Sequence, residues 1–138
     1  MKTNLKILIP LALLIFGVFI FSAFNSHPNQ APKKWVVPSS AKSMKNPTKA
    51  NSENLAVGKM LYNKHCKSCH GTKGKGDGSK AKELDTPCGD FTAASFTSQT
   101  DGEIFYKTKE GRDDMPGFKK KIPSDEDMWF IVNYVKTF

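Results

Sequence analysis

The sequence predicts an all-α domain, and three observations support this. Apolar residues recur at helical spacing through residues 124–138, and this segment opens with Ser124 and Asp127 at the spacing of a helix-capping box. A second capping-box pattern, from Thr100 to Glu103, precedes another apolar helical segment. No stretch of the chain alternates apolar and polar residues as a half-buried strand does.

Residues 1–24 are predicted to be a signal anchor or a signal peptide. Lys2 and Lys6 precede an uncharged apolar run that extends to Phe24. As a helix this run would be about 27 Å long, close to the thickness of a membrane hydrocarbon core. Bulky Phe21 and Phe24 stand where a cleavage site needs small residues, which favours an uncleaved anchor over a cleaved signal peptide.

The charges around this run predict its orientation. Lys2 and Lys6 favour the cytoplasmic side, so the rest of the chain is expected outside. We therefore expect a single-pass protein of the cell membrane with its folded domain on the periplasmic or outer face. The alternative is a soluble periplasmic protein released by cleavage.

Residues 25–50 are predicted to be a linker, since they combine four prolines and five lysines with no helical or strand period. The exception is the apolar triplet from Trp35 to Val37. It is either an interfacial anchor or incidental apolar patch, or a contact by which Trp35 docks on the folded domain.

Residues 51–138 are predicted to form that domain. A first helix is expected from about residue 51 to residue 65, where Gly58 indicates a close crossing with another helix, because glycine is otherwise costly in a helix. The terminal helix carries an apolar stripe wide enough to meet both this helix and a flat group. Trp129 projects off the stripe and receives no assignment.

A Cys-x-x-Cys-His pattern, formed by Cys66, Cys69 and His70, indicates a covalently attached haem. Two thiols at this spacing reach the two vinyl groups of a porphyrin from one helical turn, and the next residue lies under the iron. Cys88 is left over, as a buried or idle thiol or as one half of an intermolecular disulfide.

The second iron ligand has several candidates. Methionine on a helix face is more often core, and His65 adjoins the attachment motif too closely to reach the opposite face of the haem. Met115 is favoured because it lies in a loop whose backbone is restricted by Pro116. The candidates are Met115, Met128, Met60, His65 and Met44.

The net charge of +8 comes almost entirely from lysine. No basic motif interleaved with aromatic residues is present, so nucleic acid is not expected as a partner. The lysines near the motif and after Met115 either confer solubility or steer the domain toward acidic docking surfaces of redox proteins. They are Lys64, Lys67, Lys73, Lys75, Lys80, Lys82, Lys119, Lys120 and Lys121.

Two other sites are excluded by spacing. The glycine-rich stretch from Gly71 to Gly78 lacks the Gly-Lys-Ser/Thr ending of a phosphate loop, and no strand precedes it. A zinc site would need a second well-spaced pair of ligands, which the chain does not offer.

The segment from residue 55 to residue 138 resembles the single-haem class I c-type cytochromes of bacteria. The shared features are a Gly-x-x-x-aromatic helix, the Cys-x-x-Cys-His-Gly motif, a glycine-rich loop, a Met-Pro pair and an aromatic terminal helix. The resemblance implies three main helices around one haem c, with His70 and Met115 as axial ligands. It also implies that the helix containing Gly58 crosses the terminal helix.

Two features depart from the family: Cys88, which the family does not need, and a missing proline. Members of the family commonly carry a proline soon after the haem motif, and the carbonyl group of that proline orients the ligating histidine. The first proline here is Pro87, which leaves the partner of His70 open.

We therefore expect an electron-transfer protein, not an enzyme, which carries one electron between membrane respiratory complexes. With His70 and Met115 both on the iron, no position remains for a substrate. The alternatives are a haem subunit of a larger respiratory oxidoreductase, and an open-site haem enzyme or gas sensor in which Met115 is not bound.

Overall fold

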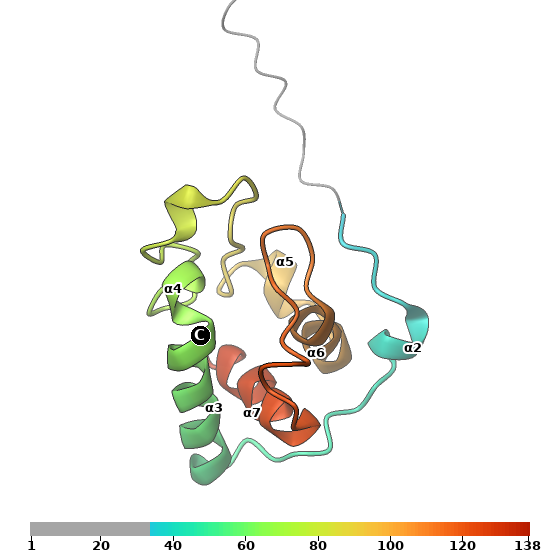
Figure 1. Ribbon diagram of the computed structural model, residues 1–138. Coiled ribbons are helices and arrows are strands. Elements are labelled where there is room, and N and C mark those ends of the chain that lie inside the picture. The colour runs from blue at the N-terminus through green and yellow to red at the C-terminus, as the bar shows by residue number, and fades with distance from the viewer. Residues whose placement is uncertain (1–33) are drawn as a thin grey trace, which may run out of the picture. The chain divides into compact units, whose positions relative to one another are not determined.

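The computed structural model describes residues 34–138, and Trp35–Phe138 form one compact unit (Figure 1). No strand occurs in this part of the chain, and Arg112 and Met115 form an isolated antiparallel bridge. The all-α prediction is confirmed for these residues. The helical segments are α2 (Ser39–Lys42), α3 (Ser52–His65), α4 (Lys67–His70), the 3-10 turn η1 (Ala81–Glu83), α5 (Ala94–Thr97), α6 (Asp101–Glu110) and α7 (Asp125–Val135).

The helices α3 and α7 cross closely, as predicted. A side chain on Gly58 would overlap the carbonyl oxygen of Phe130 and would lie 3.0 Å from Cβ of Tyr134. Figure 1 shows the two helices side by side, α3 in green and α7 in red. The absence of a side chain at Gly58 therefore sets the distance between the two helices.

Side-chain caps define where the three long helices begin. The Asn51 side chain accepts a hydrogen bond from the N–H of Asn54 at 2.8 Å at the start of α3. Thr100 and Glu103 form the predicted reciprocal capping box of α6. Ser124 accepts from the N–H of Asp127 at 3.2 Å, which confirms the predicted start of α7. The helix itself ends at Val135, three residues before the predicted end.

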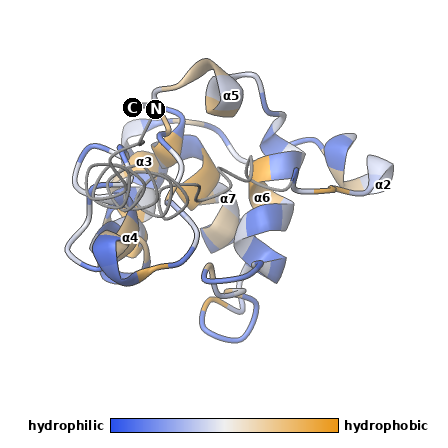
Figure 2. Ribbon diagram, turned by 90° about the horizontal axis from the view of Figure 1, so that it is seen from above, coloured by the Kyte–Doolittle hydropathy of each residue, from blue (hydrophilic) through white to orange (hydrophobic). Residues whose placement is uncertain are grey.

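The hydrophobic core lies between α3, α6 and α7. Figure 2 shows apolar residues concentrated on α7, while the outward side of α6 is hydrophilic. Trp129, which the sequence left without an assignment, is buried and stacks on Phe105 with ring centroids 4.1 Å apart. The largest fully buried side chains are Tyr62, Met128, Ile131 and Val132.

The described unit includes part of the segment that the sequence assigns to the linker. Val37 and Ala41 are each only 6% exposed, and α2 packs on α6. Trp35 lies under the guanidinium of Arg112, so it docks on the folded domain, which was one of the two interpretations of this residue. These contacts hold residues 35–48 against the domain.

Within residues 34–138, no helix is both long enough and apolar enough to cross a membrane. The predicted anchor, residues 1–24, lies outside the described residues.

Candidate haem-binding site

The Cys-x-x-Cys-His motif lies where α3 passes into α4. The N–H of Cys66 donates to the carbonyl group of Tyr62 at 2.8 Å at the end of α3. The N–H groups of Cys69 and His70 both donate to the carbonyl group of Cys66, at 3.1 and 3.0 Å. One helical turn therefore presents both thiols and the imidazole. The spacing of the motif predicts this placement of the three side chains on one turn.

Both motif cysteines are free thiols. Burial, followed by the nearby charge of Cys69, raises the pKa of Cys66 to about 12. The Cys66 side chain therefore stays protonated over the ordinary pH range. It lies in an apolar environment that suits a thioether, because a thioether carries no charge.

The imidazole of His70 is held by an aromatic stack. Its ring lies 4.6 Å from that of Phe91, with an angle of 26° between the planes. Its Nδ1 atom is buried and has no hydrogen-bond partner in the described part of the chain, in agreement with the missing family proline. Burial lowers the pKa of His70, so the ring is neutral near pH 7, the form that ligates metals.

A glycine-rich loop folds back on the α4 turn. The carbonyl group of Gly71, whose φ is +80°, accepts a hydrogen bond from the Tyr62 hydroxyl at 2.6 Å. Gly78 approaches so closely that a side chain there would overlap the carbonyl group of Ser68. Three loop N–H groups donate to the α4 turn: Gly76 to His70 at 3.0 Å, Gly78 to Cys69 at 3.1 Å and Lys80 to Ser68 at 2.8 Å.

Aromatic side chains form a wall beside His70. Phe91 stacks on Phe96 with ring centroids 4.4 Å apart, and it also contacts Phe138 at 6.2 Å. The backbone of Phe91 is held by a hydrogen bond from its N–H to the carbonyl group of Gly74 at 2.7 Å. The wall combines residues 91–96 with Phe138, more than 40 residues later, which is why no local pattern predicts it.

Residues 111–117, which we call the Met115 loop, are held by hydrogen bonds at Arg112, Asp114 and Met115. Arg112 and Met115 pair through two backbone hydrogen bonds, with N–O distances of 2.8 and 2.9 Å. The Asp114 carboxylate accepts a hydrogen bond from the N–H of Thr86 at 2.8 Å. The half-buried Met115 therefore lies on a loop with a fixed backbone.

The other candidate ligands have different surroundings. Met128 is fully buried in the hydrophobic core, and Met60 and Met44 are 60% and 40% exposed. His65 is half-buried directly before the motif, and burial lowers its pKa. Met115 is thus the candidate that is both partly buried and carried by an anchored loop.

Cys88 lies beside Cys69, a contact that sequence reasoning missed. Burial, followed by the charge of the neighbouring Cys69, raises the pKa of Cys88. The loop passes so close that a side chain on Gly76 would overlap the Cys88 carbonyl oxygen. The glycine at position 76 was the one available signal, because close approach of two backbones requires it.

These residues fit a haem c. The attachment turn supplies two free thiols and a neutral imidazole, the donor set that covalent haem requires. The aromatic wall supplies an apolar surface beside the imidazole.

Comparisons with known proteins identify the family. Residues 53–135, more than half of the chain, match the protein-family model described as "Cytochrome C oxidase, cbb3-type, subunit III". The chain is also similar to a solved chain of the Kuenenia stuttgartiensis reducing HAO-like protein complex, with 25% identity and a TM-score of 0.60. This similarity covers 76% of the present chain and 51% of the other, so the chain spans about half the length of that relative. No curated protein matches.

The matched residues include almost all of α3, the complete attachment motif, the Met115 loop and α7. Membership of this family implies haem c as the cofactor and haem-based electron transfer as the chemistry. The chain belongs to the family described as cytochrome c oxidase, cbb3-type, subunit III, and residues 53–135 form its c-type cytochrome domain.

Proposed function

We propose that the chain is a one-electron carrier with a single haem c attached to Cys66 and Cys69 and ligated by His70 and Met115. The observation that carries this proposal is the anchoring of the Met115 loop by the Arg112–Met115 bridge. A thioether on a restrained loop can be directed at an iron without disturbing a helix.

The chemistry of the chain's own residues supports an electron carrier that is not an enzyme. When bound, a haem c supplies an iron that alternates between the ferric and ferrous states. His70 offers a neutral ring nitrogen, and the Met115 thioether favours the ferrous state and so raises the reduction potential. With His70 and Met115 both holding the iron, no site on it would be left for a substrate.

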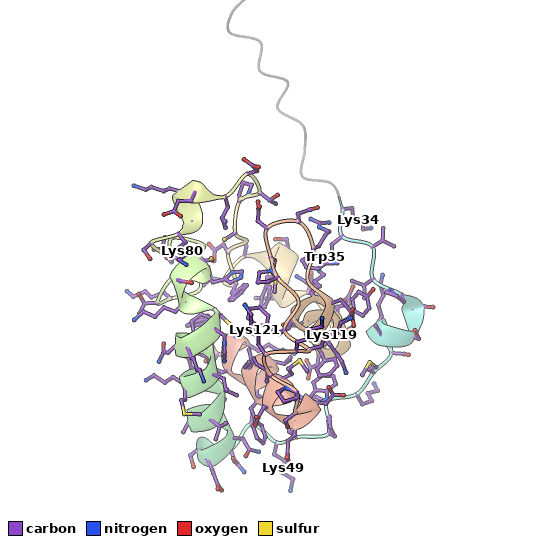
Figure 3. The ribbon with its side chains drawn as sticks, in the orientation of Figure 1. Lys34, Trp35, Lys49, Lys80, Lys119 and Lys121 are labelled. Carbon is purple, nitrogen blue, oxygen red and sulfur yellow. The ribbon has the colours of Figure 1, made fainter. Side chains whose placement is uncertain are left out.

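The exposed lysines support a role for acidic partner surfaces. Figure 3 labels three of them: Lys80 follows the attachment turn, and Lys119 and Lys121 lie between α6 and α7. The positive charge of these lysines raises the rate at which the domain encounters an acidic protein surface. We place the domain on the periplasmic face of the membrane, held by residues 1–24, where it would exchange electrons between respiratory complexes.

A second candidate function is that of a haem subunit within a larger respiratory oxidoreductase. The description of the family as an oxidase subunit favours it, as does the relative found in a protein complex. Purification of the native protein in mild detergent distinguishes the two. A free carrier elutes alone, whereas a subunit elutes with its complex.

The spectrum of the purified protein tests the ligation. We expect a near-infrared sulfur-to-iron band in the oxidised protein and no spectral change when carbon monoxide is added to the reduced protein. A high-spin spectrum that shifts with carbon monoxide would instead indicate an open-site haem enzyme or gas sensor.

Met115→Ala is expected to keep covalent haem, because both thiols remain, but to leave one axial position open. The sulfur-to-iron band should disappear, carbon monoxide should bind at full occupancy, and the reduction potential should fall. Met60→Ala, which removes an exposed methionine from α3, is the control and should behave as the wild type. An unchanged spectrum in Met115→Ala would contradict the ligand assignment.

A further inference from the structure

The segment of residues 35–48, which we name the strap, is fixed to the domain along its length. A side chain on Gly102 of α6 would overlap the carbonyl oxygen of Ala41, so the two backbones are in contact. The Thr100 hydroxyl, at the start of α6, donates to the carbonyl group of Lys42 at 3.0 Å. The middle of the strap therefore has a defined position on α6.

The end of the strap is held by α7. Asn46 donates from its side-chain nitrogen to Oδ1 of Asn133 at 2.8 Å. Asn133 in turn donates to the hydroxyl oxygen of Thr48 at 2.9 Å. Because Asn133 is only 9% exposed, these hydrogen bonds satisfy polar groups that would otherwise be buried without partners.

The beginning of the strap contacts the Met115 loop through a cation–π stack. The guanidinium carbon of Arg112 lies 4.7 Å from the centre of the Trp35 ring, and Nζ of Lys107 lies 5.5 Å from it. Arg112 is the single arginine of the sequence. A planar guanidinium stacks on an aromatic face in a way that a lysine ammonium does not.

The contact reaches Met115 through the backbone. The backbone N–H of Arg112 donates to the carbonyl group of Met115, and the N–H of Met115 donates to the carbonyl group of Arg112. The two residues therefore shift together. Asp114, between them, accepts a hydrogen bond from the N–H of Thr86 at 2.8 Å. The strap thus contacts the Met115 loop at Arg112, which also pairs with Asp113 at 3.0 Å, and the N–H of Thr86 contacts the loop at Asp114.

We propose that Trp35 is a positioning residue for Met115. The strap holds Arg112, and Arg112 holds the backbone of Met115, which keeps the thioether directed at the iron. The inference rests on the proposed ligation by Met115 and adds a residue outside the matched family region, because Trp35 precedes residue 53. Loss of the aromatic face removes this contact from Arg112, which loosens the loop and raises the fraction of molecules with an open iron.

The test uses the full-length holoprotein with Trp35→Ala, Trp35→Leu and Trp35→Phe. Leucine keeps an apolar side chain without a π face, and phenylalanine restores a π face. The apparent affinity of the reduced protein for carbon monoxide is expected to be about three- to tenfold higher in the Ala and Leu variants than in the wild type. The sulfur-to-iron band should weaken and the reduction potential fall in both, and Trp35→Phe should return all three measurements toward the wild type.

Val36→Ala is the matched control, because Val36 is the next residue and is 82% exposed. It should leave every measurement unchanged. If Trp35→Ala unfolds at the assay temperature, the folded Leu and Phe variants decide the outcome. Wild-type carbon monoxide binding in Trp35→Leu overturns the role of Trp35, provided that Met115→Ala opens the iron. An open iron in the wild type itself overturns the proposed ligation instead.

Discussion

Tyr62 connects the core of the domain to the attachment site. Its ring is fully buried and lies 5.4 Å from that of Tyr134 and 5.3 Å from that of Phe138. Its hydroxyl donates to Gly71, the residue after the ligating histidine. One side chain therefore packs against the terminal residues and also fixes the start of the glycine-rich loop.

Tyr62→Phe is expected to lower the free energy of unfolding at pH 7 by about 1–3 kcal/mol, because the buried Gly71 carbonyl group loses its donor. Burial raises the pKa of Tyr62 above its ordinary value of 10.0, so the folded state binds the phenol proton more tightly than the unfolded state. This contribution is complete below pH 10.0 and is lost as the pH rises further. Urea unfolding of both proteins at neutral and alkaline pH should show a difference that shrinks above pH 10.0.

Cys88→Ser is expected to keep the full haem content, since the attachment turn retains both of its thiols. Cys88 contacts Cys69 but lies outside that turn, and serine keeps its size. Mass spectrometry of the denatured protein should find haem still bound. Cys69→Ser, the comparison variant, should lose one of the two thioether bonds. Loss of haem from Cys88→Ser would assign Cys88 a part in attachment.

At the scale of elements, the crossing of α3 and α7 determines the shape of the core. Gly58→Ala should destabilise the domain by at least about 2 kcal/mol, because the new methyl group meets backbone atoms of α7 that cannot move aside cheaply. This loss outweighs the gain of about 1 kcal/mol that alanine brings to a helix.

Gly89→Ala provides the control for this variant. A methyl group at Gly89 would meet no other protein atom within 4 Å, so the expected change lies within about 0.5 kcal/mol. Thermal unfolding of the two holoproteins in parallel measures the difference. Equal unfolding temperatures would show that the helices can separate without loss.

At the scale of the whole molecule, the charge of +8 predicts salt-dependent electron transfer. The lysines from Lys64 to Lys82 are exposed and form no salt bridge with another described residue. Oxidation of the reduced protein by an anionic reagent should slow as ionic strength rises, because the Debye length falls to about 10 Å at 0.1 M salt.

A cationic oxidant serves as the control in stopped-flow measurements and should react faster as salt is added. If both reagents show the same salt dependence, the lysines near the attachment motif do not steer partners. Their role would then be limited to solubility.

The sequence predicted the features that depend on neighbouring residues. The capping residues Thr100 and Ser124 follow from spacing alone, and so does the placement of Cys66, Cys69 and His70 in one turn. The crossing at Gly58 could be predicted because glycine destabilises a helix, so its presence there indicates close contact with another element. Each of these features is determined within a few residues.

Features formed by distant segments escaped prediction. Trp129 has its place because Phe105 stacks on it, and Cys88 meets Cys69 only through the fold of an aperiodic loop. The strap looked like a linker because its prolines and lysines give no period, yet its asparagine and threonine side chains find partners on α7. The amino-acid composition of the strap shows that it lacks a regular pattern, but it does not predict such contacts.

The packing of Tyr62 against Phe138 has a consequence for biosynthesis. The ring of Phe138 packs against the rings of Tyr62 and Phe91, so this part of the core is complete only after residue 138 has been made. At about 5–20 residues per second, the segment after His70 takes several seconds to synthesise. Throughout that interval Cys66 and Cys69 belong to a chain whose hydrophobic core is incomplete. The order of the sequence therefore leaves both thiols next to an incomplete core until the last residues of the domain have been made.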